Sequence, residues 1–188
     1  GSIVSIDPGV ETFQTLYDAK GVVTQIGSDD MKNILVKIYK KIDKYKSARS
    51  SATGRRKRNI IKKIFFLNNK YKNLITEIHN KTCVYIYKNY NNVLIPNISN
   101  IKSKNRDNNR NILSWSHGKF IERLTHHMHK HGKKINIITE EYTSKTCGNC
   151  GWLDNNLSNR DTFRCRSCNL QISRDINGAR NILLKHLK

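Results

Sequence analysis

The chain is poor in acidic residues and contains no long apolar run. Asp and Glu together number only 14, against 35 Lys and Arg, in 188 residues. No apolar stretch approaches the roughly 18 residues that a membrane-spanning helix needs, and no secretory signal is recognisable. These absences argue against a membrane protein and a secreted basic protein, and they favour an intracellular protein of the nucleus or cytoplasm.

The excess of basic residues predicts a polyanionic partner. A formal charge of +21 attracts phosphate backbones with a marked dependence on salt. We therefore expect the chain to bind nucleic acid. A chain of this length can bury a core and fits one domain, or one domain with a small insert.

The first residues suggest a fragment. Gly1-Ser2 is typical of a cleavage scar, and no Met precedes the strand pattern that begins at Ile3. We expect the chain to be excised from a longer protein.

Four cysteines form two CxxC pairs with the spacing Cys147-x2-Cys150-x14-Cys165-x2-Cys168. Each CxxC turn lets two thiolates reach one ion, and two turns complete a tetrahedral tetrathiolate site. The alternatives are two disulfides or four idle thiols, which the lack of a secretory signal disfavours. The spacing is that of a zinc ribbon.

Carboxylates stand on both sides of the cysteines, at Glu140 or Glu141 and at Asp175, and a third lies far away at Asp7. Mg²⁺ binds through a few carboxylates plus substrate phosphate. Three carboxylates from separate elements suit a two-metal phosphodiesterase. For Asp7 taken alone, a surface turn at Asp7-Pro8-Gly9 is an equally good interpretation.

Hydrophobic periodicity predicts alternating strands and helices. Strands are expected at 3–6, 12–17, 22–26, 93–95 and 134–138. Helices are expected as a hairpin over about 31–90 with a break at 47–54, at 115–131, and from Asp175 onward. The last helix should bury Ile176, Ala179, Leu183 and Leu187. This order predicts an α/β fold with a five-stranded mixed sheet covered by helices, similar to the RNase H-like fold.

The predicted helical hairpin is strongly basic. Between Met31 and Lys72 it holds fifteen Lys or Arg and one acid, Asp43. A solvated helix face or a localisation signal would explain this, but the one-sided charge favours contact with a nucleic-acid backbone. The candidate contacts are Arg49, Arg55, Arg56, Lys57, Arg58, Lys62 and Lys63.

Neither Cys83 nor the histidine-rich run is expected to form a further metal site. Cys83 has no CxxC partner and is most simply a core thiol. His126, His127, His129 and His131 cover more than one helix face, with no carboxylate among them. Phosphate contact is the alternative for some of these histidines.

Several motifs together carry a resemblance to a known family. The runs TSKTCGNCGW, CRSC and RDINGARNIL resemble the nuclease half of the transposon-encoded TnpB proteins, of the related Fanzor proteins of eukaryotes and giant viruses, and of type V CRISPR effectors. Asp7 in IDPGV matches the first RuvC motif and Asp175 matches the third. The basic run KYKSARSSATGRRKRNIIKK also resembles the family. The resemblance covers nearly the whole chain.

One departure concerns the middle catalytic Glu. TnpB proteins usually carry it at the end of the fourth strand, where this chain reads Ile95-Pro96-Asn97-Ile98, with no carboxylate. Fanzor-like proteins resemble this chain in carrying a relocated Glu just before the ribbon, where Glu140 stands. Strand alternation puts Glu140 and Glu141 on opposite faces, and the resemblance favours Glu140.

The resemblance implies an RNA-guided DNA endonuclease with guide RNA and DNA as partners, and neither a membrane nor a small-molecule substrate. Asp7 would bridge two Mg²⁺ ions, for which Mn²⁺ could substitute, while Glu140 and Asp175 would each hold one. Arg174 would steady a phosphate or form an outward salt bridge. Zinc would be structural.

The resemblance also divides the chain. It implies an RNase H-like (RuvC) nuclease domain over 3–146 plus 169–188, with the basic hairpin inserted, and a zinc ribbon over 147–168. The guide-binding lobes would precede this fragment, so we expect weak or no specific activity from the fragment alone.

Two rival functions remain open. Another RNase H-like enzyme, such as a transposase or junction resolvase, is disfavoured by the ribbon between the second and third motifs. A catalytically inactive nucleic-acid-binding module is favoured by Pro96 and disfavoured by the retention of Asp7 and Asp175 with a relocated Glu140.

Overall fold

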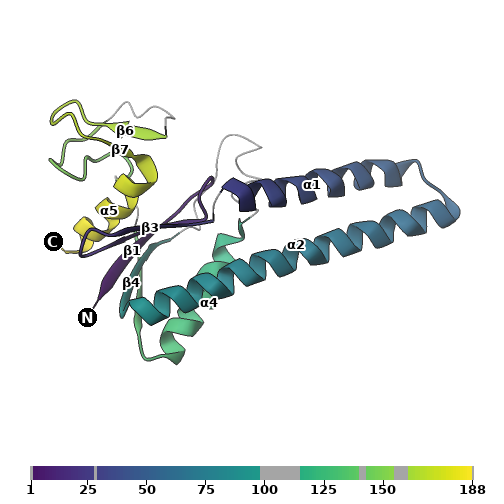
Figure 1. The fold of residues 1–188 in the computed structure, drawn as a ribbon, viewed down its shortest axis with the longest axis horizontal. Coiled ribbons are helices and arrows are strands. Elements are labelled where there is room, and N and C mark those ends of the chain that lie inside the picture. The colour runs from purple at the N-terminus through teal and green to yellow at the C-terminus, as the bar shows by residue number, and fades with distance from the viewer. Residues whose placement is uncertain (1, 28, 98–114, 140–142, 155–160, 188) are drawn as a thin grey trace.

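The computed structural model describes residues 2–27, 29–97, 115–139, 143–154 and 161–187. Within these ranges a five-stranded sheet separates two helical layers (Figure 1). One layer is the C-terminal helix, and the other contains the long helices of the middle of the chain. A smaller two-stranded sheet lies beyond the C-terminal helix.

The main sheet is mixed, as the sequence predicts. Its strands are β1 (Ile3–Pro8), β2 (Gln14–Asp18), β3 (Val23–Ile26), β4 (Asn92–Pro96) and β5 (Lys134–Ile138), in the spatial order β3-β2-β1-β4-β5. The first three form an antiparallel meander, while β4 runs parallel to both β1 and β5. Each predicted strand is confirmed within a residue or two at its ends.

The predicted helices are also present. They are α1 (Asp29–Ser50), α2 (Gly54–Asn89), α4 (His117–Lys130) and α5 (Arg174–His186). The first two form the expected hairpin, which extends well beyond the sheet (Figure 1). None of the described helices combines the length and apolar composition that crossing a membrane requires.

The two faces of β1 carry different side chains, because alternate residues of a strand point in opposite directions. Val4 and Ile6 are fully buried in the large core that includes α2 and α4. Ser5, between them, points to the other face, where its hydroxyl donates a 2.6 Å hydrogen bond to the carbonyl of Ala179. The face of β1 that carries Ser5 therefore meets α5.

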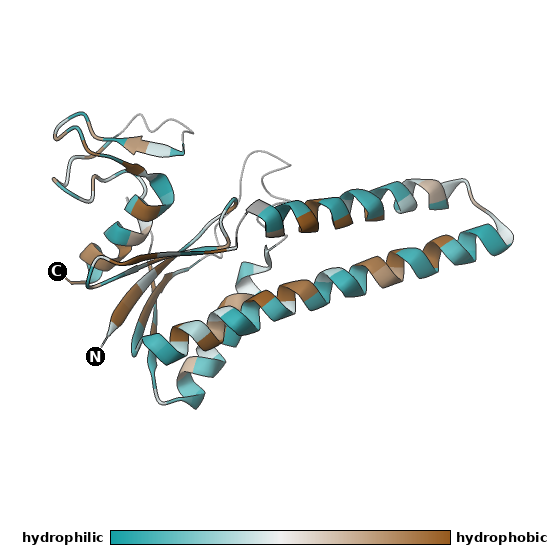
Figure 2. Cartoon of the chain, viewed as in Figure 1, coloured by the Kyte–Doolittle hydropathy of each residue, from teal (hydrophilic) through white to brown (hydrophobic). Residues whose placement is uncertain are grey.

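The hairpin is held together by apolar residues at helical spacing. Leu35, Ile38 and Ile42 of α1 are buried, and the rings of Tyr39 and Tyr71 lie 4.6 Å apart between the helices. Hydrophobic residues recur among hydrophilic ones along both helices (Figure 2). Because one stripe of each helix is buried, the basic residues remain on the outer surfaces.

Phe13 is the centre of an aromatic cluster behind the sheet. Its ring is stacked with those of His79 and His117, with centroid distances of 5.3 and 5.5 Å. His117 donates from Nε2 to the carbonyl of Gly9 (3.1 Å) and accepts from the amide of Gln14 at Nδ1 (3.2 Å). Burial lowers the pKa of His117 to about 4. The imidazole is therefore neutral, with its proton on Nε2.

The interpretation of Cys83 as a core thiol is confirmed. Its side chain is fully buried, and burial raises the pKa of the thiol to about 12. In the histidine-rich run, the rings of His127 and His131 stack on Tyr87. No group of three metal-ligating side chains includes these histidines in the described ranges.

The buried His117 predicts a pH dependence of stability. Its pKa is about 4 when folded, against about 6.5 when unfolded. Between these values the unfolded chain binds a proton that the folded chain does not, so this contribution to stability falls as the pH falls from 6.5 towards 4. At pH 5 the loss should be on the order of 2 kcal/mol.

Urea unfolding at pH 7 and pH 5 measures this loss. His117→Gln should show a smaller decrease in unfolding free energy than the wild type. His129→Gln changes an exposed position of the same helix. Its unfolding free energy should decrease by as much as that of the wild type. Equal decreases in wild type and His117→Gln would contradict the assignment.

Candidate functional site

Asp7 and Asp175 meet where β1 ends beside the first turn of α5. Asp7 is the fifth residue of β1, and Asp175 is the second residue of α5. A Cβ built on Gly178 would overlap the Oδ2 atom of Asp7, and one built on Gly9 would lie 3.6 Å from Oδ2 of Asp175. The fold thus brings together two carboxylates from opposite ends of the chain.

The contact with Asp7 requires a glycine at position 178. Gly178 lies inside α5, where glycine is about 1 kcal/mol less favourable than alanine. Its lack of a side chain lets the carboxylate of Asp7 approach the helix backbone closely. The intrinsic cost to the helix is thus offset by an approach that no other residue permits.

The surroundings of Asp175 favour a bound cation. Burial raises the pKa of Asp175, and the charges of Asp161 and Glu11 raise it further, while the neighbouring Arg174 lowers it. A half-buried carboxylate close to other acids is stabilised in its charged form by a cation. Arg174 is the neighbouring residue that lowers this pKa. Its contact with a phosphate stays a prediction.

The third predicted carboxylate falls outside the described residues, as does its alternative: Glu140 and Glu141 are both in the range 140–142. Pro96 is described, and it pairs with Ile138 in the β4–β5 register. Ser5 of β1 pairs with Leu94, two residues before Pro96. The end of β4 therefore lies beside Asp7 and brings no carboxylate of its own at Pro96.

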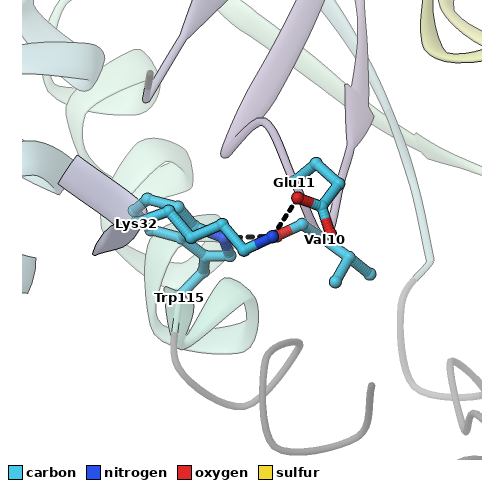
Figure 3. A network of polar contacts seen from close by, with 4 residues as sticks. All are labelled: Val10, Glu11, Lys32 and Trp115. Carbon is cyan, nitrogen blue, oxygen red and sulfur yellow. Dashed lines mark hydrogen bonds and ion pairs between the residues drawn. The ribbon is translucent and has the colours of Figure 1, made fainter. Parts of the chain in front are cut away.

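Three contacts hold the loop that follows Asp7. Glu11 forms an ion pair with Lys32 of α1, and the indole of Trp115 donates a 3.0 Å hydrogen bond to the carbonyl of Val10 (Figure 3). His117 binds the carbonyl of Gly9. These contacts connect the carboxylate site to the base of the hairpin and to the start of α4.

The four cysteines form a cluster, as their spacing predicts. Their Sγ atoms all lie within 4.8 Å of one another. The Cys147–Cys168 and Cys150–Cys165 sulfurs are 3.7 and 3.5 Å apart, so no disulfide joins them. A tetrahedral ion with metal–sulfur bonds of about 2.3 Å sets its sulfurs roughly 3.8 Å apart. The four thiols therefore fit one ion such as zinc.

Residues next to the cysteine cluster donate hydrogen bonds to the sulfur of Cys168. The backbone N–H of Leu170 and the side-chain amide of Asn149 lower the pKa of Cys168, while burial raises the pKa of the neighbouring Cys165. Around the sulfurs, Phe163 is buried, with Trp152 and Ile172 packed against it. The small sheet of β6 (Thr162–Arg164) and β7 (Gln171–Ser173) leads directly into α5.

Two asparagines of α5 attach the ribbon to the helix. Asn177 accepts from the N–H of Gly148 at 2.9 Å and donates to the carbonyl of Thr146 at 2.8 Å. Asn181 donates to the carbonyls of Thr143 and Thr146 at 2.8 and 2.6 Å. The first CxxC turn is thereby fixed to the same helix that carries Asp175.

Sequence reasoning missed these asparagines and Gly178, although they lie within the RDINGARN motif. It predicted a purely apolar stripe, and this is wrong at Leu187, which is 61% exposed. The buried face combines two kinds of residue. Ile182 and Leu183 pack with Leu94 in an apolar cluster, while the polar and small residues meet the loop around the first CxxC turn and β1. The signal in the sequence was the spacing of two Asn four residues apart.

The predicted nucleic-acid contacts are exposed on the distal half of the hairpin. Residues 49, 55–58, 62 and 63 are all exposed. They lie towards the end of the hairpin that is remote from the sheet (Figure 1). The structure thus separates them from Asp7 and Asp175, and their role in binding stays a prediction.

The contact between Gly178 and Asp7 predicts an unusual effect of alanine. Gly178→Ala should gain clearly less unfolding free energy than the roughly 1 kcal/mol that helix propensity alone would give, because the new methyl group has to displace the carboxylate of Asp7. Gly118→Ala is the matched control, since it is a helical glycine of α4 with nothing within 4 Å of an added Cβ. That variant should gain up to about 1 kcal/mol. Urea unfolding distinguishes the two, and equal gains would refute the close approach.

The sequence and the fold of this chain are both similar to those of Cas12f1. Residues 117–182 match the family model for the Cas12f1-like TNB domain. The chain is 28% identical to TnpB-like protein L79 of Acanthamoeba polyphaga mimivirus, over 97% of this chain and 37% of that protein. It is 29% identical to the CRISPR-associated endodeoxyribonuclease Cas12f1 of Sulfoacidibacillus thermotolerans, over 42% of this chain and 19% of that protein.

The fold resembles that of a solved complex. The cryo-EM structure of a Cas12f1–sgRNA–target DNA complex matches with a TM-score of 0.72 at 23% identity, covering 96% of this chain and 38% of the matched chain. The chain spans less than half the length of the curated relatives it matches.

Proposed function

Because the chain is a TnpB-related protein, we propose that it is the nuclease part of an RNA-guided DNA endonuclease with an RNase H-like (RuvC) fold. The observation that carries this proposal is the meeting of Asp7 and Asp175 at the end of β1. It is supported by the likeness to Cas12f1, an endodeoxyribonuclease.

The third carboxylate of the proposed site is Glu140. Ile138, the last residue of β5, packs against the cluster of Leu94, Ile182 and Leu183, so β5 ends on the face of the sheet that Ser5 and α5 share. Glu140 follows two residues later in the sequence. The resemblance to Fanzor-like proteins, with a relocated Glu just before the cysteines, favours Glu140 over Glu141.

The chain's own residues would hold and orient the reacting groups. Asp7, Glu140 and Asp175 would hold two Mg²⁺ ions, for which Mn²⁺ could substitute. Bound metal would supply an activated water and would stabilise the leaving oxygen of the phosphodiester. Arg174, next to Asp175, would orient a phosphate, and the half-buried position of Asp175 limits competition from bulk water.

We assign the ribbon a structural zinc ion. Four thiolates close the coordination shell and leave no position for a substrate or water. The ion would fix the loop that Asn177 and Asn181 bind, and through it the start of α5. Zinc would thus act on the reaction only by positioning Asp175.

The proposed partners are guide RNA and DNA. The exposed basic residues of the hairpin would contact phosphates, since almost all charged residues of the hairpin are positive. The remainder of the full-length protein would supply guide binding and target recognition, because the relatives are more than twice as long as this chain.

A second candidate is a nucleic-acid-binding module of the same fold without catalysis. The observation that favours it is Pro96 at the end of β4, beside Asp7, where a carboxylate would otherwise contribute to a metal site. In this case Asp7 and Asp175 alone would offer too few ligands to hold two metal ions.

Alanine variants test the catalytic assignment. Cleavage of labelled single-stranded DNA in Mg²⁺ or Mn²⁺ should fall by at least about 100-fold in Asp7→Ala, Asp175→Ala and Glu140→Ala, because each removes a metal ligand. Glu141→Ala, its immediate neighbour, is the matched control and should cleave like the wild type. The assay should include the full-length protein with its guide RNA, since the isolated chain is expected to be weak.

Different outcomes separate the candidates. Loss of cleavage in Glu141→Ala but not in Glu140→Ala would move the third ligand by one residue. Cleavage that survives Asp7→Ala would exclude the proposed site. A full-length protein that binds its guide and target but never cleaves would favour the inactive module.

Removal of a ribbon cysteine should release zinc. The wild type should contain about one zinc ion per chain, measured by atomic emission, and Cys147→Ser should contain far less. Cys83→Ala changes the fifth, core cysteine and should keep its zinc. Hydrogen exchange should increase in 143–154 and in the first turns of α5 in Cys147→Ser, because Asn177 and Asn181 bind that loop. Full zinc in Cys147→Ser would contradict the assignment.

A further inference from the structure

A groove lies between the two helices of the basic hairpin, well away from Asp7 and Asp175. The volume of this open groove is about 380 Å³. Its lining combines aromatic, aliphatic and cationic side chains: Lys41, Tyr45, Lys62, Lys63, Phe66 and Leu67. The volume is at the small end of the range of roughly 300–1,000 Å³ that encloses small organic groups. The groove therefore suits a single planar group rather than a protein helix.

Phe66 is the most exposed apolar side chain that lines this groove. It is 67% exposed and lies on a helix that also exposes many Lys and Arg. Phe65, the next residue, is equally exposed but does not line the groove. An aromatic ring left in water at the edge of a concave site is available to stack on a ligand.

The charges of the groove determine what kind of ligand it fits. The ammonium of Lys63 lies 5.4 Å from the centre of the Tyr45 ring, where a cation–π contact holds it at the rim. Lys41 and Lys62 add two further positive charges, and Asp43 is the one acid between Met31 and Lys72. A flat apolar group attached to anionic groups on either side matches this pattern, and a nucleotide has that form.

We propose that this groove binds an unpaired base of a single-stranded nucleic acid, with the base against Phe66 and Tyr45 and the adjacent phosphates near Lys41, Lys62 and Lys63. Stacking on aromatic rings combined with basic contacts to the backbone is a general means of binding single strands. A base inside a duplex is excluded, because its neighbours in the stack cover both of its faces. The proposal rests on the proposed nucleic-acid partner, but it does not depend on catalysis.

The test separates stacking from charge. Binding of a short fluorescein-labelled oligo(dT) or oligo(U) is measured by anisotropy, in an Asp7→Ala background that prevents cleavage. The comparison strand is an oligonucleotide of equal length whose sugars carry no bases, so that it keeps every phosphate. Phe66→Ala should weaken binding of the base-bearing strand by about 5- to 100-fold and should leave binding of the abasic strand unchanged.

Phe65→Ala is the matched control, because it removes an equally exposed ring one residue away. It should bind both strands like the parent protein. A preference for oligo(dT) or for oligo(U) identifies which strand occupies the groove, and either preference supports the proposal.

Three results would overturn the proposal: equal binding of abasic and base-bearing strands by the parent protein, equal losses in Phe65→Ala and Phe66→Ala, or an equal loss of duplex binding in Phe66→Ala. The first would leave only electrostatic attraction, and the second a general apolar surface. The third would mean that the contact does not require an unpaired base. Failure of the nuclease assignment would instead appear as cleavage that does not depend on Asp7, which these binding measurements do not involve.

Discussion

The close packing of α5 against β1 is the contact on which the carboxylate site depends. Ser5 donates to the carbonyl of Ala179, and the carboxylate of Asp7 lies directly against the Cα of Gly178. One turn earlier, the same helix carries Asp175. Because β1 and α5 come from opposite ends of the chain, only this packing makes the two carboxylates neighbours. Any change that moves the helix outward separates the proposed metal ligands.

The cysteine ribbon stabilises this helix rather than the reacting groups. Asn177 and Asn181 satisfy backbone groups of the first CxxC turn, in a buried region where unpaired polar groups are costly. The ribbon and the carboxylate site therefore share one element. On the opposite side, the pair of Lys32 with Glu11 joins the loop after Asp7 to the first helix of the hairpin. The proposed site is thus supported from the ribbon and from the hairpin.

The hairpin itself combines two properties that usually conflict. Its inner stripe packs tightly enough to hold two long helices together, while its outer surface concentrates positive charge that would repel itself in the absence of a polyanion. Phe66 and Tyr45 lie where these two surfaces meet, at the rim of the groove. A charged surface alone binds phosphates without discrimination, and the aromatic rings give it a means to distinguish unpaired strands.

Local pattern was enough to predict the strands, the helices and the cysteine cluster, because hydrophobic alternation and CxxC spacing depend on residues close in sequence. The grouping of Asp7 with Asp175 was proposed from the chemistry of scattered carboxylates and supported by family resemblance, since no local rule connects the two residues. Tertiary structure alone decided the rest. Gly178, Asn177 and the exposed Leu187 depend on what α5 packs against, and the groove at Phe66 depends on how two helices lie side by side. Such features arise from contacts between distant segments, which short-range periodicity does not record.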